Sequence, residues 1–301
     1  MKILIISILV SLMVGSSSTE TKVYKPYVLG TKTSESLAVA TQNISAMLVK
    51  QGFTIEGVYK PTWDSKRTVI CVSSKNLIKA AQQIGGLAGF ASVLRVGITQ
   101  NGAEVEISYT NPYYWGNAYY GSKYPKVEAE YIAVNNAFIK TMKSYGTYTG
   151  KFYGSAKGVE EDDLRDYQYM IGMPQFDDVV VVKDFESYAV ATAKIDANLK
   201  AGSTIFKKVY DIQIPGKNLK LYGIAILGEM GEKSFMPKID IGNPKHTAFL
   251  PYELLVKDDK VYMLHGRFRI AVSFPDLTMA TFSKIMSTPG DIEKVMKLVC
   301  K

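Results

Sequence analysis

The sequence predicts an α+β protein made of two similar domains, each a mostly antiparallel sheet with helices packed on one face. Three observations support this. A helical segment occurs twice, strand-like runs follow both copies in the same order, and Asn101-Gly102 marks a tight hairpin between two of these runs. Consecutive strands with few helices between them are typical of antiparallel sheets.

The repeated segment aligns without gaps. Residues 35–48 (ESLAVATQNISAML) match residues 186–199 (ESYAVATAKIDANL) at a constant offset of 151, with nine of the 14 positions identical. Apolar residues at spacings of three and four predict a helix in each copy. Thr33 or Ser34 is the expected N-cap of the first helix, and Asp184 that of the second.

Strands are expected after each repeated helix in the same order. In the first copy they are residues 53–59, 68–72, 93–99 and 103–109, and in the second 205–212, 219–226, 252–256, 261–264 and 267–272. A helix or loop is expected between the second and third strands, at residues 76–86 and 243–249. Each copy then ends in a helical stretch, residues 127–144 and 290–298.

The N-terminus has the pattern of a secretory signal peptide. Lys2 precedes an apolar run, Ile3–Val14, and small residues follow at 15–18. The run is too short for a stable membrane span, which needs about 20 residues. Residues 1–18 are therefore predicted to be a cleaved signal peptide, with an uncleaved anchor as the alternative. The mature protein is expected in the periplasm of a bacterium or outside the cell.

The sequence contains two cysteines and has a formal net charge of +8, which raises the questions of a disulfide bond and of an anionic partner. Export would allow a disulfide between Cys71 and Cys300, and the alternative is a buried Cys71 with a loose Cys300. The lysines and arginines are scattered, without a run of five or more. We therefore expect no nucleic-acid partner, and interpret the charge as a solvated surface.

Residues 241–256 (IGNPKHTAFLPYELLV) and the following Asp258-Asp259-Lys260-Val261 resemble the Asn-Pro and Leu-Pro signature, with its trailing hairpin, of the bacterial domain of unknown function 302. The resemblance covers roughly residues 27–115 and 177–285 and is better in the second copy. The first copy has Ser-Ser-Lys-Asn at residues 73–76 and Ala-Ser-Val at residues 91–93, where the second has Gly-Asn-Pro and Phe-Leu-Pro.

This resemblance implies a compact α+β fold that tends to dimerise. Two tandem copies would then form a pseudo-dimer within one chain, as a monomer with an internal pseudo-two-fold axis or as a weak dimer. The expected boundaries are residues 19–145 for the first copy, 146–176 for a connector and 177–301 for the second copy. The resemblance implies no established reaction and assigns no catalytic residue.

Residues 113–125 are unusually aromatic and contain two glycines, which predicts an irregular segment. Tyr114, Trp115 and Tyr119 are candidates for an aromatic-lined ligand site at the junction of the two copies. The alternative is that these rings pack the segment against that junction, as large aromatic side chains commonly do.

The connector contains four consecutive acidic residues, 160–163. Carboxylates at this density could bind calcium, but the spacing lacks the EF-hand pattern. Acidic residues also favour the first turn of a helix, where they face the positive end of its dipole. We favour the helix, with Leu164, Tyr167 and Ile171 on its apolar side.

Catalytic and cofactor motifs are absent from the sequence. It has two histidines, no G-x-S-x-G elbow, no C-x-x-C pair and no phosphate-binding loop. No metal and no cofactor are therefore expected. A polar site at the Asn-Pro turn of the second copy, formed by His246, Asn243 and Glu253, is the remaining chemical candidate.

Three functional hypotheses stay open at this point. The first is a non-catalytic exported protein that binds a small ligand or an envelope protein at the junction of the copies. The second is an enzyme or redox accessory protein with its site near Asn243-Pro244. The third is a structural envelope protein, which would have neither a cleft nor a ligand.

Overall fold

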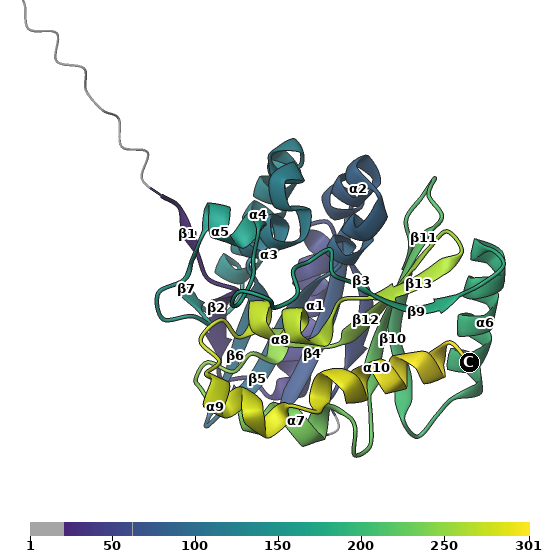
Figure 1. Ribbon diagram of the computed structural model, residues 1–301. Helices are drawn as coiled ribbons and strands as arrows, with labels where there is room; N and C mark the ends of the chain where they lie inside the picture. The colour runs from purple at the N-terminus through teal and green to yellow at the C-terminus, as the bar shows by residue number, and fades with distance from the viewer. Residues whose placement is uncertain (1–20, 62) are drawn as a thin grey trace, which may run out of the picture.

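The computed structural model describes residues 21–61 and 63–301, so the predicted signal peptide lies outside the described residues. The chain is 42% helix and 28% strand, with antiparallel sheets and helices, which confirms the α+β class. Figure 1 shows the sheets in the middle of the molecule, with helices around them. Residues 21–176 are called the first half below, and residues 177–301 the second half.

The first half contains a six-stranded antiparallel sheet with the order β3-β4-β5-β6-β2-β7. Its strands are β2 (Tyr27–Thr33), β3 (Phe53–Tyr59), β4 (Arg67–Ser74), β5 (Leu94–Asn101), β6 (Glu104–Thr110) and β7 (Thr147–Tyr153). The helices are α1 (Leu37–Lys50), α2 (Lys75–Ile84), α3 (Pro112–Tyr120), α4 (Glu128–Lys143) and α5 (Glu161–Arg165), with 3₁₀ helices η1 (Gly86–Ser92) and η2 (Gly121–Lys126). Strands β1 (Val23–Tyr24) and β8 (Val159–Glu160) form a separate pair.

The second half contains a five-stranded antiparallel sheet with the order β10-β11-β12-β13-β9. Its strands are β9 (Val180–Asp184), β10 (Phe206–Gln213), β11 (Leu219–Ile226), β12 (Tyr252–Lys257) and β13 (Lys260–Met263). The helices are α6 (Tyr188–Ala201), α7 (Glu232–Ile239), α8 (Gly266–Ser273), α9 (Met279–Phe282) and α10 (Thr288–Val299), with 3₁₀ helices η3 (Thr247–Phe249) and η4 (Ser283–Ile285).

The repeated segment forms a helix in both halves, as the apolar spacing predicts. Helices α1 and α6 have 14 residues each and start 151 residues apart. Their N-caps are Ser36 and Ser187, not the predicted Thr33, Ser34 or Asp184. Each serine side chain accepts a hydrogen bond from the backbone N–H three residues later, which satisfies one of the free donors of the first turn.

Two segments next to the sheets differ from the sequence prediction. Residues 112–120 form α3 although irregular structure is predicted there, and residues 266–273 form α8 although a strand is predicted. The side chains of Asn111 and His265 explain both starts, because each accepts a hydrogen bond from the backbone N–H two residues later. The alternation of apolar and polar residues at 267–272 predicts a strand, but this segment is helical and has His265 as its N-cap.

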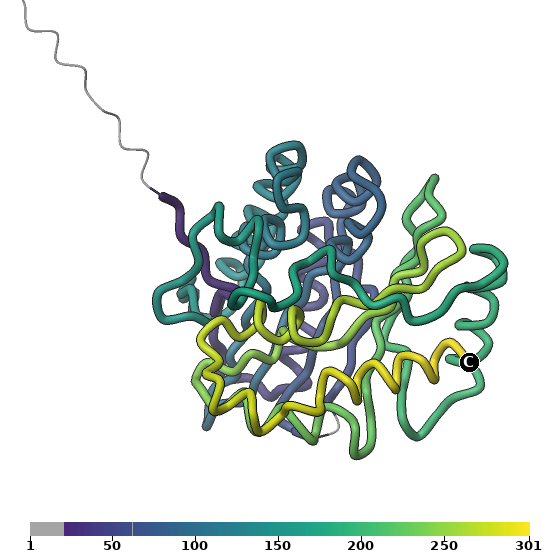
Figure 2. Tube along the Cα trace, in the orientation of Figure 1, coloured from purple at the N-terminus to yellow at the C-terminus, as the bar shows by residue number. Residues whose placement is uncertain are grey.

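The connector, residues 146–176, contains regular secondary structure and joins the first sheet, although it is predicted as a separate segment between the two copies. Its first part, β7, pairs with β2 and extends the first sheet. The acidic run begins α5, as predicted, and Leu164 and Tyr167 are buried. Ile171, however, is fully exposed, because the helix already ends at Arg165. Figure 2 traces the rest of the connector, in teal, across the molecule to β9.

Both faces of the second sheet are buried. On β12, Leu254 and Val256 belong to the core formed with the second half's own helices, whereas Leu255 belongs to the core of the first half. Leu255 lies against Gly89 of η1, where a Cβ would collide with its side chain. The alternation along β12 therefore places one face against the helices and the other against the first half. The surface where the halves meet is called the seam.

The seam brings two backbones unusually close together. Gly57 of β3 lies against Val209 of β10, and a Cβ at Gly57 would collide with the carbonyl oxygen of Val209. Gly97 of β5 lies in the same way against the backbone of Ala248. Glycine is required at both places because backbone of the other half approaches closely there, β10 at Gly57 and the 3₁₀ helix η3 at Gly97.

A buried ion pair crosses the centre of the seam. The guanidinium of Arg95 on β5 contacts the carboxylate of Glu253 on β12, and both side chains are almost fully buried. Tyr210 donates its hydroxyl hydrogen bond to the same carboxylate at 2.9 Å. Arg269 of α8 lies nearby, with its Nε 3.9 Å from the other carboxylate oxygen. Glu253 is therefore the acceptor to which three donors from both halves are directed.

Both cysteines are buried free thiols. Burial raises the pKa of Cys71 and of Cys300 to about 12. The thiols are therefore protonated and unreactive at neutral pH. The expected loose Cys300 is wrong: it lies in the core of the second half, beneath the end of α10.

The helices of the described residues were also compared with the requirements of a membrane span. Among residues 21–61 and 63–301, no helix combines the length and apolarity needed to cross a bilayer.

The Arg95–Glu253 pair gives a stability prediction. Arg95→Met should lower the free energy of unfolding by about 3–5 kcal/mol, because it removes the direct contact of the buried Glu253 carboxylate with Arg95 and leaves Arg269, at 3.9 Å, as its cationic neighbour. The double variant Arg95→Met/Glu253→Met should be more stable than Arg95→Met alone. Urea denaturation measures both. Lys294→Met, which removes an exposed ion pair with Asp291, should change stability by less than about 0.5 kcal/mol. An Arg95→Met variant as stable as this control would contradict the role of the pair.

Candidate functional site

His246 and Asp240 form a fixed pair in the segment between α7 and η3. The Nδ1 atom of His246 lies 3.0 Å from the Oδ1 atom of Asp240, and the backbone N–H of His246 donates to the same oxygen at 3.0 Å. Asp240 is the residue that ends α7. Two bonds to one carboxylate oxygen fix both the backbone and the ring of His246.

Arg67 connects this pair to the first half. Its guanidinium contacts the other carboxylate oxygen of Asp240, and both side chains are almost fully buried. Burial alone would raise the pKa of Asp240, but the hydrogen bonds from His246 and the charges of His246 and Arg67 outweigh it and hold the pKa below its usual value. Asp240 is thus an ionised acceptor at neutral pH. In neutral His246 the proton is then on Nδ1, and Nε2 carries the lone pair.

The His246 ring is surrounded by aromatic side chains. Its centroid lies 4.5 Å from that of Phe274, 5.0 Å from that of Tyr27 and 5.8 Å from that of Tyr153. The Nε2 atom is buried and has no hydrogen-bond partner among the described residues. A buried polar atom without a partner is uncommon in folded proteins, and it sets His246 apart from the other polar groups of this segment.

An open pocket of about 400 Å³ lies beside His246. The first half contributes Tyr153, the last residue of β7, and residues 154–156 of the following loop, and the second half contributes the segments around Asn243 and Phe274. Its apolar wall includes Ile239, Ile241, Pro244 and Leu277, and its polar groups come from His246, Asn243, Ser155, Asp276, Thr278 and Thr281. This mixture of an apolar wall with a few polar groups is typical of small-molecule sites.

The structure brings two of the three predicted site residues of the Asn-Pro turn together. His246 and Asn243 line the same pocket, and the Asn243-Pro244 peptide bond is cis. Glu253 does not belong to this group, because it lies on β12 and points into the seam, where it contacts Arg95. The carboxylate that holds His246 is Asp240 instead.

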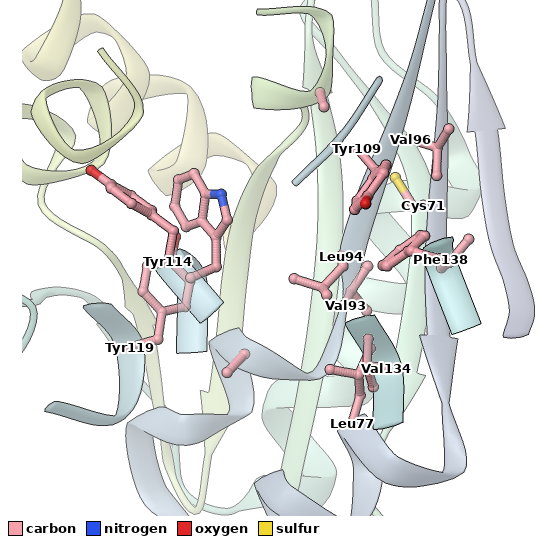
Figure 3. Packing of buried hydrophobic residues seen from close by; sticks show 14 of the residues in the cluster. Cys71, Leu77, Val93, Leu94, Val96, Tyr109, Tyr114, Tyr119, Val134 and Phe138 are labelled. Atoms are coloured by element: carbon pink, nitrogen blue, oxygen red, sulfur yellow. The ribbon is translucent and has the colours of Figure 1, made fainter. Parts of the chain in front are cut away.

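Tyr114 and Trp115 lie inside the junction of the halves. Tyr114 donates its hydroxyl hydrogen bond to the carbonyl of Val272 at 2.8 Å, and the Trp115 indole donates to the carbonyl of Pro26 at 2.9 Å. The Arg269 guanidinium covers the Trp115 ring at 5.2 Å. Figure 3 shows Tyr114 and Tyr119 within the buried packing. These contacts correspond to the packing alternative for the aromatic segment.

Tyr119 differs from its neighbours because it also borders a second pocket, of about 390 Å³. Its ring stacks on Phe176 of the connector with centroids 5.0 Å apart. The pocket lies between Gly85-Gly86 of the first half and the connector around Arg165. The Arg165 guanidinium is occupied by Asn117, Glu161 and Asp162. The Arg165 guanidinium at this pocket is therefore already satisfied.

Sequence reasoning missed Asp240, Ser155 and Asp276. Asp240 precedes His246 by six residues, a spacing with no general meaning, and Asp276 follows Phe274-Pro275 in an irregular segment. Ser155 donates its hydroxyl hydrogen bond to Asp276 at 3.0 Å although 121 residues separate them. Nothing in the local sequence connects these three residues, since the fold of both halves brings them together.

Glu232, in the first turn of α7, is the most strongly perturbed carboxyl group of the seam. Burial raises its pKa to about 8, although hydrogen bonds from the backbone N–H of Ile226 and the hydroxyl of Tyr59 lower it in part. Glu232 lines neither of the two pockets described above. It is therefore a protonated structural group at neutral pH rather than part of the candidate site.

Metal binding was considered from the arrangement of ligand-type side chains. Within residues 21–61 and 63–301, no group of three or more His, Cys, Asp or Glu side chains is arranged to hold a metal ion.

The chain was compared with known proteins. No protein-family model matches it, and no curated protein is similar to it in sequence. The resemblance to the domain of unknown function 302 therefore remains a prediction.

Glu232 gives a prediction for pH dependence. The carboxyl group ionises near pH 4.5 in the unfolded chain but only near pH 8 in the folded one. Its contribution to stability is therefore complete below pH 4.5 and is lost as the pH rises toward 8. Glu232→Gln should match the wild type at pH 4.5 and exceed it by roughly 2–4 kcal/mol at pH 7.5.

Urea denaturation across this pH range measures the difference between variant and wild type. The control is Glu229→Gln, three residues earlier, whose side chain is 89% exposed. It should leave the pH dependence unchanged. An equal difference at pH 4.5 and 7.5 for Glu232→Gln would show that the carboxyl group is not perturbed.

Proposed function

We propose that the chain is an exported, non-catalytic ligand-binding protein, built as an internal pseudo-dimer of two related domains. Its binding site is the pocket beside His246, at the border of the two halves. The observation that carries this proposal is the open pocket of about 400 Å³ itself, whose walls come from both halves and meet at a histidine that Asp240 and Arg67 hold in place. Export rests on the N-terminal sequence, and the resemblance to the domain of unknown function 302 supports the duplicated architecture.

The strand orders support the pseudo-dimer. In each sheet, the four strands after the repeated helix lie in sequence order, and the strand before that helix follows next. The orders are β3-β4-β5-β6-β2 in the first sheet and β10-β11-β12-β13-β9 in the second. The contacts across the seam are also reciprocal: β5 packs against η3, and β12 packs against η1. Reciprocal contacts between corresponding elements are expected around a two-fold axis.

Corresponding residues also meet at this axis. Both β3 and β10 contain an irregularity in their pairing with the next strand. In each sheet, the residue directly after this irregularity pairs with a residue of the second strand, which in turn pairs with a residue of the third strand. These cross-strand rows are Gly57, Cys71 and Arg95 in the first sheet, and Tyr210, Gly223 and Glu253 in the second. Arg95 and Glu253 therefore occupy corresponding positions and form an ion pair with each other. Two identical chains could not provide opposite charges there, which favours a duplication whose halves have diverged.

The pocket depends on both halves for its walls. The loop after β7 provides one side, and it is attached to the second half by hydrogen bonds from Ser155 and the backbone N–H of Ala156 to Asp276. Tyr153 donates its hydroxyl hydrogen bond to the carbonyl of Lys245, next to His246. Borders between domains are a common place for ligand sites. A pre-formed pocket of this kind needs little rearrangement to bind a small molecule.

An enzyme is the second candidate, and the Asp240–His246 pair is the observation that favours it. A carboxylate on Nδ1 and a free Nε2 are also the arrangement of a general base. The nearest side-chain hydroxyl of the first half's loop, that of Ser155, already donates to Asp276 and accepts from the backbone of Gly158. The Ser155 hydroxyl is therefore not free to act as a nucleophile for His246, and we favour ligand binding over catalysis.

Closing the pocket tests the proposal. Gly242 lines it, and a Cβ at this position meets no atom within 4 Å, so Gly242→Phe places a bulky side chain at the rim of the pocket without a steric clash at its Cβ. A library of small organic fragments would be screened by ligand-observed NMR against the full chain. Fragments that bind the wild type at this pocket should lose binding to Gly242→Phe by at least tenfold.

Gly290→Phe is the matched control, because a Cβ at Gly290 also meets no atom within 4 Å and this residue lies at a different pocket. It should retain the hits of the wild type. If Gly242→Phe is folded by circular dichroism and retains every hit, the pocket beside His246 is not the binding site.

A further inference from the structure

Asp276 is the charged side chain among the residues that line the pocket beside His246. The hydroxyl of Ser155 donates to its Oδ1 atom at 3.0 Å, and the backbone N–H of Ala156 donates to its Oδ2 atom at 2.6 Å. These neutral donors fix the carboxylate without cancelling its charge. Within residues 21–61 and 63–301, Asp276 makes no ion pair.

The lysines close to the pocket do not neutralise Asp276. Lys25 donates from Nζ to the carbonyl of Ala156 at 2.8 Å, and Lys245 donates to the carbonyl of Asp240 at 3.1 Å. Neither lysine is a lining residue. Behind His246, the Arg67 guanidinium is occupied by two carboxylates, those of Asp240 and Asp64, and is not available to Asp276. The lining surface therefore has one uncompensated negative charge.

The remaining walls suit the same kind of ligand. Tyr153, Phe274 and His246 provide aromatic rings on one side of the pocket. Aromatic faces attract cations through their quadrupoles, and a nearby carboxylate adds a direct electrostatic contribution. The aromatic rings and the carboxylate thus favour a cationic ligand.

We propose that the ligand of this pocket is a small organic cation, an amine with an apolar body, whose ammonium group pairs with Asp276. This inference rests on the proposed binding function and specifies its ligand class. The apolar body lies against Ile239, Pro244 and Leu277 on the opposite wall. A carboxylic acid of the same size is excluded by repulsion from Asp276, and a neutral alcohol binds without the ionic contribution.

Three probes with the same apolar body test this assignment: hexylamine, 1-hexanol and hexanoate. Their dissociation constants would be measured by NMR titration of the full chain at neutral pH. Because Asp276 is exposed to solvent, hexylamine should bind about two- to fivefold more tightly than 1-hexanol, and hexanoate more weakly than both. Asp276→Asn removes the charge and keeps one of the two acceptor oxygens, which can still accept from the backbone N–H of Ala156, and it should remove most of the preference for the amine.

Asp258→Asn is the matched control. Asp258 lies in the β12–β13 turn with a φ of 55°, a conformation that asparagine also adopts readily. The amine preference should be unchanged in this variant. Gly242→Phe should abolish binding of all three probes.

The outcomes separate the two proposals. If 1-hexanol or hexanoate binds as tightly as hexylamine, and Gly242→Phe abolishes this binding, the pocket is a ligand site but the cation assignment is wrong. If Asp276→Asn leaves the amine preference intact, the assignment to Asp276 is wrong. If none of the probes shows binding that depends on Gly242, the results contradict both the ligand class and the proposed function.

Discussion

The ion pair between Arg95 and Glu253 is the constraint on which the arrangement of the halves depends. Two charges removed from water are tolerated only where each remains beside the other with further hydrogen bonds, which Tyr210 provides here. The seam must therefore keep one register. The close approach of Gly57 to Val209 fixes the same register through shape. With the halves held in this way, the loop after β7 lies beside the Asn-Pro segment and the pocket exists.

Much of the fold could be predicted because its signals are local. The repeated helices follow from apolar spacing, and the strands from alternation and from the Asn101-Gly102 turn. Helices α3 and α8 could not be read from their apolar patterns, because a single side chain in front of each, Asn111 or His265, decides how it begins. The burial of both faces of β12 could not be predicted from its own residues either, because one face is covered by the other half of the chain.

The candidate site could be predicted only in part for the same reason. His246 and Asn243 lie in one turn, and the sequence indicated them together with Glu253, which the fold places in the seam instead. Their partners come from elsewhere: Arg67 from β4, Ser155 from the loop after β7, and Asp276 from the segment before α9. Each of these residues is an ordinary polar residue in its own segment, and it gains a role only when the seam closes. The aromatic residues of α3 are the opposite case. They form a conspicuous pattern in the sequence that suggested a ligand site, but their side chains are buried and pack the junction of the halves.

The most direct test of the account is a crystal structure of the full chain grown with hexylamine. The account predicts density for one hexylamine molecule in the pocket between the halves, with its nitrogen within hydrogen-bond distance of Asp276 and its chain against the apolar wall. Clear density for the protein around this pocket, with hexylamine bound elsewhere or not at all, would contradict the claim that the seam creates a site for a small organic cation.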